Sequence, residues 1–312
     1  MLETSEDASS SMNVDNKFSS HFAPELNEIE IGNFNNRDEN ATTFVDTSEP
    51  KYSGVFEGRG GSTCSNFLAE NLLAFLSPID LEEDTETKVV TGFKSCDDSF
   101  YSKHPSDNSG SSAIVAFIDK LSIFLAWSGN SRAVLMYNNN VKQLTTPHSP
   151  LNANERHRIV SHGGLIVQGQ IMGVLDTSRG FGDNDIKRNV NEGVLISEPD
   201  TFRLTLDENL VASSKFCFLI LATAPVWDMY TNEAACKAVS TALMQGGNNP
   251  KIAAKALAEG AVKKGAKNGV TVSVITWGKT SASSWRSRSS SNASWRSWRS
   301  FSNVDELISK PF

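Results

Sequence analysis

The stretch that most constrains the fold of this chain is residues 55–62, which read Val-Phe-Glu-Gly-Arg-Gly-Gly-Ser. The apolar residues before Glu57 predict the end of a buried strand, with Glu57 at the point where the strand stops. Three of the next four residues are glycines, so the backbone can turn tightly before a helix begins near Ser62. A carboxylate at a strand end is suited to holding a metal ion or a proton. Taken alone, so short a stretch favours the simpler interpretation, a turn whose glycines serve only backbone geometry.

The spacing of apolar residues predicts alternating groups of strands and helices along the chain. Helical spacing occurs in residues 63–76, 80–101, 152–162, 233–244 and 251–264. Short apolar runs predict strands from Ile29 onward and at residues 52–56, 113–118, 121–127, 133–137, 201–206, 216–222 and 270–277. The three runs between residues 113 and 137 are joined by tight turns, which predicts an antiparallel meander. The order of these elements predicts an α+β domain in which an antiparallel sheet sandwich carries helices on its outside.

Charge divides the chain into three parts. Residues 1–50 hold eleven acidic and two basic side chains, whereas residues 279–312 hold six basic and two acidic ones. With a total of −7, residues 51–278 therefore carry about −2. Residues 1–27 are polar and poor in large apolar residues, which predicts an acidic disordered segment. We expect a folded domain over residues 28–278 and a disordered tail rich in Ser, Arg and Trp over residues 279–312.

The sequence also bounds the cellular compartment. No apolar run approaches the ~20 residues that span a bilayer, and the acidic, serine-rich start is not typical of a signal peptide. We therefore expect a cytoplasmic or nuclear protein. The four cysteines lack metal-ligand spacing and three of them lie in apolar segments, which predicts reduced, buried thiols.

Seven short motifs follow one another along the predicted domain. They lie at residues 55–62, 110–113 (Gly-Ser-Ser-Ala), 128–135 (Ser-Gly-Asn-Ser-Arg-Ala-Val-Leu), 173–183, 197–200 (Ser-Glu-Pro-Asp), 219–228 and 265–272. Together and in this order they resemble the metal-dependent type 2C protein serine/threonine phosphatases. Residues 28–278 are therefore expected to form a type 2C phosphatase-like domain, because a series in family order is far more specific than any one motif.

The resemblance implies a fold and a chemistry. The fold is a four-layer sandwich, in which two antiparallel β-sheets pack face to face and helices cover both outer sides. At one edge of that sandwich, family members hold a pair of Mn²⁺ or Mg²⁺ ions mainly through aspartates, and a bridging water is ionised to attack phosphorus. Two hard dications close together require several anionic oxygens as ligands.

The resemblance also places the family's metal-ligand positions, and most of them are changed here. They fall on Asn40, Glu57, Gly58, Ala224 and Asn268. Only Glu57, with its carboxylate, and Gly58, with its carbonyl, keep a ligand-type group, and we expect neither to hold a metal. The aspartates are replaced by amides at Asn40 and Asn268 and by a methyl group at Ala224. One of four main ligand carboxylates remains, so two dications would be left largely unneutralised.

Further changes surround these positions. Asn130 replaces another aspartate, and Asn35 stands where the family has its phosphate-binding arginine, whose loss removes a bidentate contact to the substrate. Arg59 replaces a histidine two residues from Glu57. Pro225 replaces a glycine and removes an amide donor. Glu57 is therefore expected to pair with Arg59 or with a neighbouring amide rather than with metal ions.

These changes lead to one functional interpretation and one alternative. The interpretation is a pseudophosphatase, without a catalytic residue or a cofactor, that acts as a binding or regulatory module in phospho-signalling. Its partners would be proteins, among them phosphoproteins or kinases. The alternative is an active or residually active protein serine/threonine phosphatase with an altered site that uses Mn²⁺ or Mg²⁺.

The tail has features that the resemblance does not explain. Ser-Trp-Arg-Ser occurs at residues 284–287 and again at 294–297, and a third Trp-Arg-Ser follows at 298–300. Tryptophan beside arginine suits a protein groove, an anionic membrane surface or a single-stranded nucleic acid. Serines placed after arginines also suit phosphorylation, which would reverse the local charge. A soluble tail without a specific use fits the composition as well, so these alternatives stay open.

Overall fold

A computed structural model describes residues 29–36, 40–45, 50–76, 84–267 and 269–277. The predicted N-terminal segment, residues 1–27, and the predicted tail, residues 279–312, lie outside the described residues. Within the described part, no helix is both long enough and apolar enough to span a bilayer.

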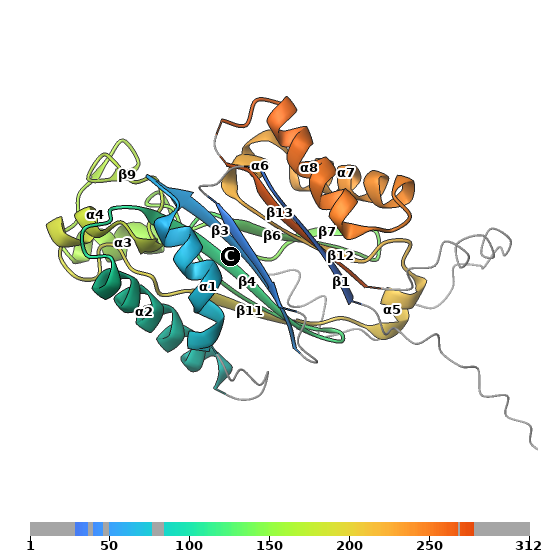
Figure 1. Cartoon of the computed structure of the whole chain (residues 1–312), viewed down its shortest axis with the longest axis horizontal. Coiled ribbons are helices and arrows are strands. Elements are labelled where there is room, and N and C mark those ends of the chain that lie inside the picture. Colours follow the sequence, from blue (N-terminus) through green and yellow to red (C-terminus); the bar gives the residue numbers. More distant parts are fainter. Residues whose placement is uncertain (1–28, 37–39, 46–49, 77–83, 268, 278–312) are drawn as a thin grey trace, which may run out of the picture.

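Two antiparallel sheets form the centre of the molecule (Figure 1). Across the first, sheet A, the strands are β1 (Ile29–Asn35), β13 (Thr271–Trp277), β12 (Phe218–Ala222), β6 (Arg132–Tyr137) and β7 (Asn140–Gln143). Across the second, sheet B, they are β11 (Asp200–Thr205), β5 (Ser122–Ser128), β4 (Gly110–Asp119), β3 (Lys51–Arg59) and β2 (Ala41–Val45). A short strand, β10 (Phe181–Gly182), also pairs with β4, and β8 (Ile166–Val167) pairs with β9 (Gln170–Ile171) in a separate hairpin.

Helices cover the outer face of each sheet. The first pair, α1 and α2, covers sheet B, and the second pair, α7 and α8, covers sheet A (Figure 1). The helices are α1 (Thr63–Leu76), α2 (Thr85–Lys103), α3 (Ala153–Ser161), α4 (Asn184–Asn189), α5 (Glu208–Ser213), α6 (Ala224–Met229), α7 (Asn232–Gln245) and α8 (Pro250–Lys263). The predicted four-layer α+β sandwich is thereby confirmed.

Three buried apolar layers hold this arrangement together. Alternation along the strands decides which layer each side chain enters: Val134 of β6 faces the α7 and α8 helices, whereas Ala133 and Leu135 face sheet B. In β4, likewise, Val115 faces α1 and α2, and Ile114 faces sheet A. Each fully buried aliphatic side chain contributes about 1.5–3 kcal/mol of transfer free energy.

Local signals explain where the covering helices begin. Thr231 caps α7 by accepting a hydrogen bond from the Ala234 amide at 3.2 Å. Asn249 caps α8 by accepting from the Lys251 amide at 2.9 Å, and Pro250 occupies the first helical turn, where its missing N–H breaks no bond. The start of α8 lies so close to β1 that a Cβ on Gly32 would come within 2.0 Å of the Lys251 nitrogen.

The fold corrects three expectations. The prediction of a three-stranded meander is wrong for its last strand: β4 and β5 pair with each other, but β6 pairs with β12 and β7 in sheet A. Glu57 does not end its strand, because residues 57–59 continue to pair with residues 110–112 of β4. Asp84, inside the helix predicted at residues 80–101, has a left-handed φ of 71° that a helix does not allow, and α2 begins at Thr85. Residues 80–83 of that prediction lie outside the described residues.

Candidate functional site

The positions singled out in the sequence come together at one edge of the sandwich, where β1, β3 and β13 of the two sheets approach one another. Asn35 ends β1, Asn40 precedes β2, and Glu57 lies near the end of β3. Ala224 begins α6 directly after β12, and Thr271 begins β13. Asn268 lies outside the described residues.

Asn40 uses both ends of its side-chain amide within the protein. Its Oδ1 accepts a hydrogen bond from the Gly58 amide at 3.1 Å, and its Nδ2 donates to Oγ1 of Thr271 at 3.2 Å. Asn35 joins the same network, since its Nδ2 donates to the Asn40 carbonyl at 2.6 Å and its Oδ1 accepts from Thr271 at 3.2 Å. Gly269 packs so closely that a Cβ there would lie 2.7 Å from the Asn40 amide nitrogen. The amide therefore links sheet A to sheet B.

Glu57 is buried, with 9% of its surface exposed, and its partner is a backbone amide. Its Oε2 accepts a hydrogen bond from the Ala224 nitrogen at 3.0 Å, in agreement with the expected neighbouring amide. Burial raises the pKa of Glu57 to about 7, helped by Asp176 and Asp228, against the opposing effects of the Ala224 amide and Arg59. Near neutral pH, the protonated and ionised forms of this carboxyl are therefore both populated.

Arg59 pairs with the carboxylate of Asp183. Its Nη2 lies 2.6 Å from Oδ2 of Asp183, and its Nη1 donates to Ser112 at 3.1 Å. Ser112 in turn donates to the Asn130 side chain at 3.0 Å. Of the two partners expected for Glu57, the neighbouring amide is the one found, and Arg59 belongs to a chain of polar contacts from β3 to the loop after β5. Arg59 still lies close enough to Glu57 to lower its pKa.

The position of Pro225 at the start of α6 explains why a proline is tolerated there. It lies in the first turn of α6, where a backbone N–H would have no acceptor within the helix. Ala224, just before it, offers only its backbone amide to Glu57. The replacement of a carboxylate by a methyl group at residue 224 therefore leaves the start of the helix intact and removes an anionic oxygen.

These side chains do not fit a pair of Mn²⁺ or Mg²⁺ ions. At the described ligand positions they supply one carboxyl group with a raised pKa, one amide whose polar atoms are both engaged, and one methyl group. Such ions require several anionic oxygens. Within the described part of the chain, moreover, no three His, Cys, Asp or Glu side chains are grouped as metal ligands.

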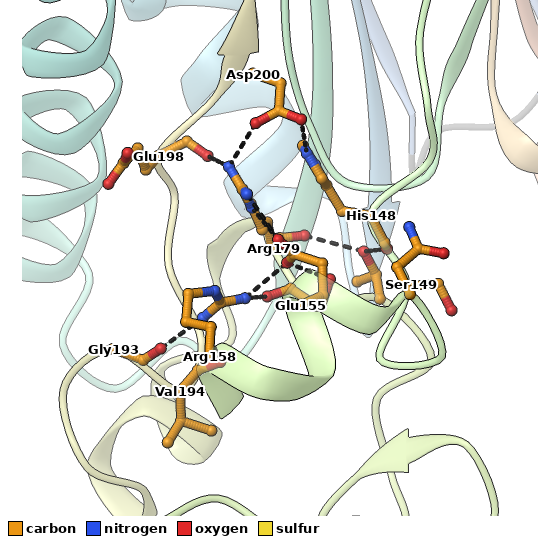
Figure 2. Close-up of polar contacts among 12 residues, drawn as sticks. His148, Ser149, Glu155, Arg158, Arg179, Gly193, Val194, Glu198 and Asp200 are labelled. Carbon is orange, nitrogen blue, oxygen red and sulfur yellow. Dashed lines mark hydrogen bonds and ion pairs between the residues drawn. The ribbon is translucent and has the colours of Figure 1, made fainter. Parts of the chain in front are cut away.

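A second polar cluster is centred on Glu155 of α3 (Figure 2). Glu155 binds two guanidinium groups, with Nη2 of Arg179 at 2.6 Å and Nη2 of Arg158 at 2.7 Å. Arg179 also reaches Asp200 at 3.0 Å, and His148 lies 3.2 Å from the other oxygen of Asp200. The cluster therefore joins α3, the loop before β10 and the start of β11.

This cluster positions the partner of Arg59. The loop that carries Arg179 continues through Gly180, where a Cβ would lie 2.7 Å from the Arg59 guanidinium, and reaches Asp183 three residues later. The sequence analysis did not single out Glu155. The one available signal was the spacing of Glu155 and Arg158, which places opposite charges three residues apart on a predicted helix.

The fold and the placement of these side chains define a phosphatase-type sandwich. The family comparison agrees: residues 20–270 match "Protein phosphatase 2C", and the chain belongs to this family. "Probable protein phosphatase 2C 45" of Oryza sativa subsp. japonica is 30% identical over 227 residues, covering 71% of this chain and 75% of that protein. "Probable protein phosphatase 2C 30" of Arabidopsis thaliana is 32% identical over 237 residues, covering 72% of this chain but 57% of that protein.

A solved structure shows the same fold. The serine-threonine phosphatase 2C from Toxoplasma gondii superposes with a TM-score of 0.63 over 80% of this chain and 95% of that one, at 18% identity. The fold is therefore shared with a phosphatase 2C of known structure.

The raised pKa of Glu57 gives a testable pH dependence. The folded protein keeps the Glu57 proton up to about pH 7, whereas the unfolded carboxyl loses it near 4.5, so this favourable contribution is lost as the pH rises between those values. Glu57→Gln removes the titration and keeps an acceptor for Ala224. As the pH rises from 4.5 to 7, we expect the free energy of unfolding of the variant to increase by roughly 3 kcal/mol relative to that of wild type. Above pH 7 this difference should stay constant.

Urea denaturation at several pH values measures this difference. Glu70→Gln, on the exposed face of α1, serves as the matched control and is expected to change the free energy of unfolding by less than ~0.5 kcal/mol. A Glu57→Gln difference that does not vary between pH 5 and pH 8 would contradict the buried, neutral carboxyl.

Proposed function

We propose that this chain is a catalytically inactive member of the protein phosphatase 2C family that acts as a binding or regulatory module in phospho-signalling. Its partners are proteins, with phosphoproteins and kinases as the first candidates, and its compartment is the cytoplasm or the nucleus. The family's Mn²⁺ or Mg²⁺ ions have no role in this proposal.

The observation that carries the proposal is the engagement of Asn40. A metal ligand at this position would have to direct an anionic oxygen toward the ions. The amide instead accepts from Gly58 on one side and donates to Thr271 on the other. Hydrogen bonds between the sheets thus use the atoms at a position that the family gives to metal binding, and this supports a structural rather than a chemical role.

Glu57 and Arg59 support the same proposal. The carboxyl of Glu57 has a raised pKa, and a neutral carboxyl is a poor ligand for a hard dication. The guanidinium of Arg59 brings a permanent positive charge to the same strand end and is fixed by Asp183. Both groups therefore have partners within the protein at positions close to the proposed lost metal site.

The proposal is tested by phosphatase assays on the full-length chain. With an aryl phosphate or a phosphopeptide in millimolar Mn²⁺, we expect turnover indistinguishable from the blank, because one carboxylate cannot neutralise two dications. Glu57→Ala should give the same blank-level rate. Clear Mn²⁺-dependent turnover that disappears in Glu57→Ala would overturn the proposal.

A second candidate is an active or residually active Mn²⁺- or Mg²⁺-dependent protein serine/threonine phosphatase with an altered site. It is favoured by the names of the relatives, which are probable protein phosphatases, and by the retained carboxyl of Glu57. Isothermal calorimetry separates the two candidates: a functioning site would bind Mn²⁺ tightly, and the inactive one would give no heat beyond dilution.

A further inference from the structure

The helix pair that covers sheet A carries an open groove between α7 and α8, formed by residues other than those of the candidate site. This shallow groove has a volume of about 400 Å³, and its lining includes Lys237, Thr241, Gln245 and four alanines of α7 and α8. On the same helix pair, Met244 and Ile252 expose 54% and 47% of their surfaces. Apolar side chains thus remain accessible on a helical surface that the rest of the described chain does not cover.

This helix pair is basic, whereas the rest of the folded domain is not. Residues 232–267 hold six lysines and two glutamates, a net charge of +4, although residues 51–278 together carry about −2. The lysines are Lys237, Lys251, Lys255, Lys263, Lys264 and Lys267. One of the two glutamates, Glu259, already faces Lys255 at 3.7 Å. An occupant of this groove should therefore carry carboxylates beside apolar side chains.

A segment of that composition leaves the fold at β1, the edge strand on which α8 packs. The described chain begins with β1 at Ile29, and α8 packs directly on β1, as the contact of Gly32 with Lys251 shows (Figure 1). The 28 preceding residues hold six carboxylates and one lysine, together with large apolar residues. The carboxylates are Glu3, Glu6, Asp7, Asp15, Glu25 and Glu28, and the apolar residues include Phe18, Phe22 and Leu26.

Length and charge favour this segment over the other terminus. Twenty-eight residues can extend over as much as ~95 Å, whereas a 14-residue helix such as α8 is only about 21 Å long. The C-terminal residues leave from the same end of sheet A, because Trp277 pairs with Ile29, but residues 279–312 carry +4 and would be repelled by the lysines.

We propose that the acidic residues 1–28 dock on the groove between α7 and α8 of the same chain. Their carboxylates face the lysines, and apolar side chains among residues 12–26 cover the groove and Met244. A partner segment with the same acidic and apolar chemistry then competes with residues 1–28 for the groove.

Zero-length cross-linking of the full-length chain tests this contact, because a carbodiimide joins only carboxylates that touch lysines. In the monomer, mass spectrometry should find cross-links from Asp15 or the carboxylates before it to Lys237 or Lys255. Glu25 and Glu28 are not counted, since they lie beside Ile29 in the sequence. Raising the salt to 0.5 M should lower the yield severalfold, because the attraction is between exposed charges.

Variants make the test specific to the groove. Met244→Glu adds a negative charge to an exposed position on α7 and should lower the yield at Lys237 at least fivefold. Lys94→Glu changes the charge at an exposed position of α2, on the opposite outer layer, and should leave the cross-link yield at Lys237 unchanged. A variant that consists of residues 1–278 should give the same cross-links as wild type.

Several outcomes would overturn the proposal. These are cross-links spread equally over the lysines of α2, cross-links confined to dimers, an equal yield in Met244→Glu, or loss of the cross-links when residues 279–312 are removed. The assay contains neither metal nor phosphate ester, so its failure would leave the proposed function untouched.

Discussion

A variant with aspartate at residues 40, 57, 224 and 268 is expected to bind Mn²⁺ at least ~10²-fold more tightly than wild type and to gain Mn²⁺-dependent phosphatase activity. Four carboxylates supply the anionic oxygens that two dications require, and wild type has one of them. Without metal, the clustered carboxylates repel one another, so the variant should be less stable than wild type. At a Mn²⁺ concentration 100 times the dissociation constant, binding should raise the free energy of unfolding of this variant by about 2.7 kcal/mol.

Calorimetry gives the affinity, and hydrolysis of an aryl phosphate gives the rate. Asn154→Asp, a change of the same chemistry at an exposed position of α3, should leave both at the wild-type value. Equal Mn²⁺ affinity in wild type and in the four-aspartate variant would show that residues other than these four decide metal binding. Tight binding without turnover would instead indicate that the loss of the phosphate-binding arginine at Asn35 limits the reaction.

Removal of the Glu155 carboxylate is expected to destabilise the domain by about 3–5 kcal/mol, because it leaves two partly buried guanidinium groups without their shared partner. Glu155 is 6% exposed, and Arg158 and Arg179 are 17% and 14% exposed. Urea denaturation of Glu155→Ala at pH 7 measures the loss. Glu192→Ala, an exposed carboxylate that follows α4, should cost less than ~0.5 kcal/mol.

The pH dependence of this difference gives an independent check. Burial alone would raise the pKa of Glu155, but hydrogen bonds from Arg179, Ser178 and Arg158 outweigh it and hold the pKa at about 2. The folded carboxylate therefore stabilises the protein fully above pH 4.5, and this contribution is lost as the pH falls from 4.5 toward 2. The gap between wild type and Glu155→Ala should narrow over that range, and a constant gap would argue against the ionic cluster.

Local periodicity allowed several elements to be predicted from the sequence. The helix predicted at residues 63–76 coincides with α1, because its apolar residues recur at helical spacing and contact sheet B along one face. The predicted edge strand from Ile29 is β1, at the edge of sheet A. All four cysteines are free and buried, as expected. Such features depend on neighbours within about four residues, so the sequence contains the information directly.

Pairing between distant segments was not predictable in the same way. The turn after β5 suggested a continued meander, yet β6 crosses to sheet A and pairs with β12, some 85 residues later in the chain. The alternation of β6 is compatible with either sheet. Packing decides between them, because Val134 completes the layer under α7 and α8 while Leu135 completes the layer between the sheets.

At the candidate site, too, the residues were predictable from the sequence and some of their contacts were not. The resemblance placed residues 35, 40, 57 and 224 at one site, and the structure brings them to one edge of the sandwich. The partner of Arg59, in contrast, was not predicted: it is Asp183, because the guanidinium reaches across to the loop fixed by Glu155 and Arg179. Contacts of this kind arise only when three separate segments are folded against one another.

The sequence by itself determined the family, the order of its motifs, and the chemical identity of the groups at the metal-ligand positions, since these depend only on which residue stands where. The tertiary structure decided what those groups now do. Asn40 joins the two sheets, Glu57 is buried against the Ala224 amide with a raised pKa, and Arg59 is bound to Asp183. The physical reason is that hydrogen bonding, burial and ion pairing depend on distances between residues that lie far apart in the chain.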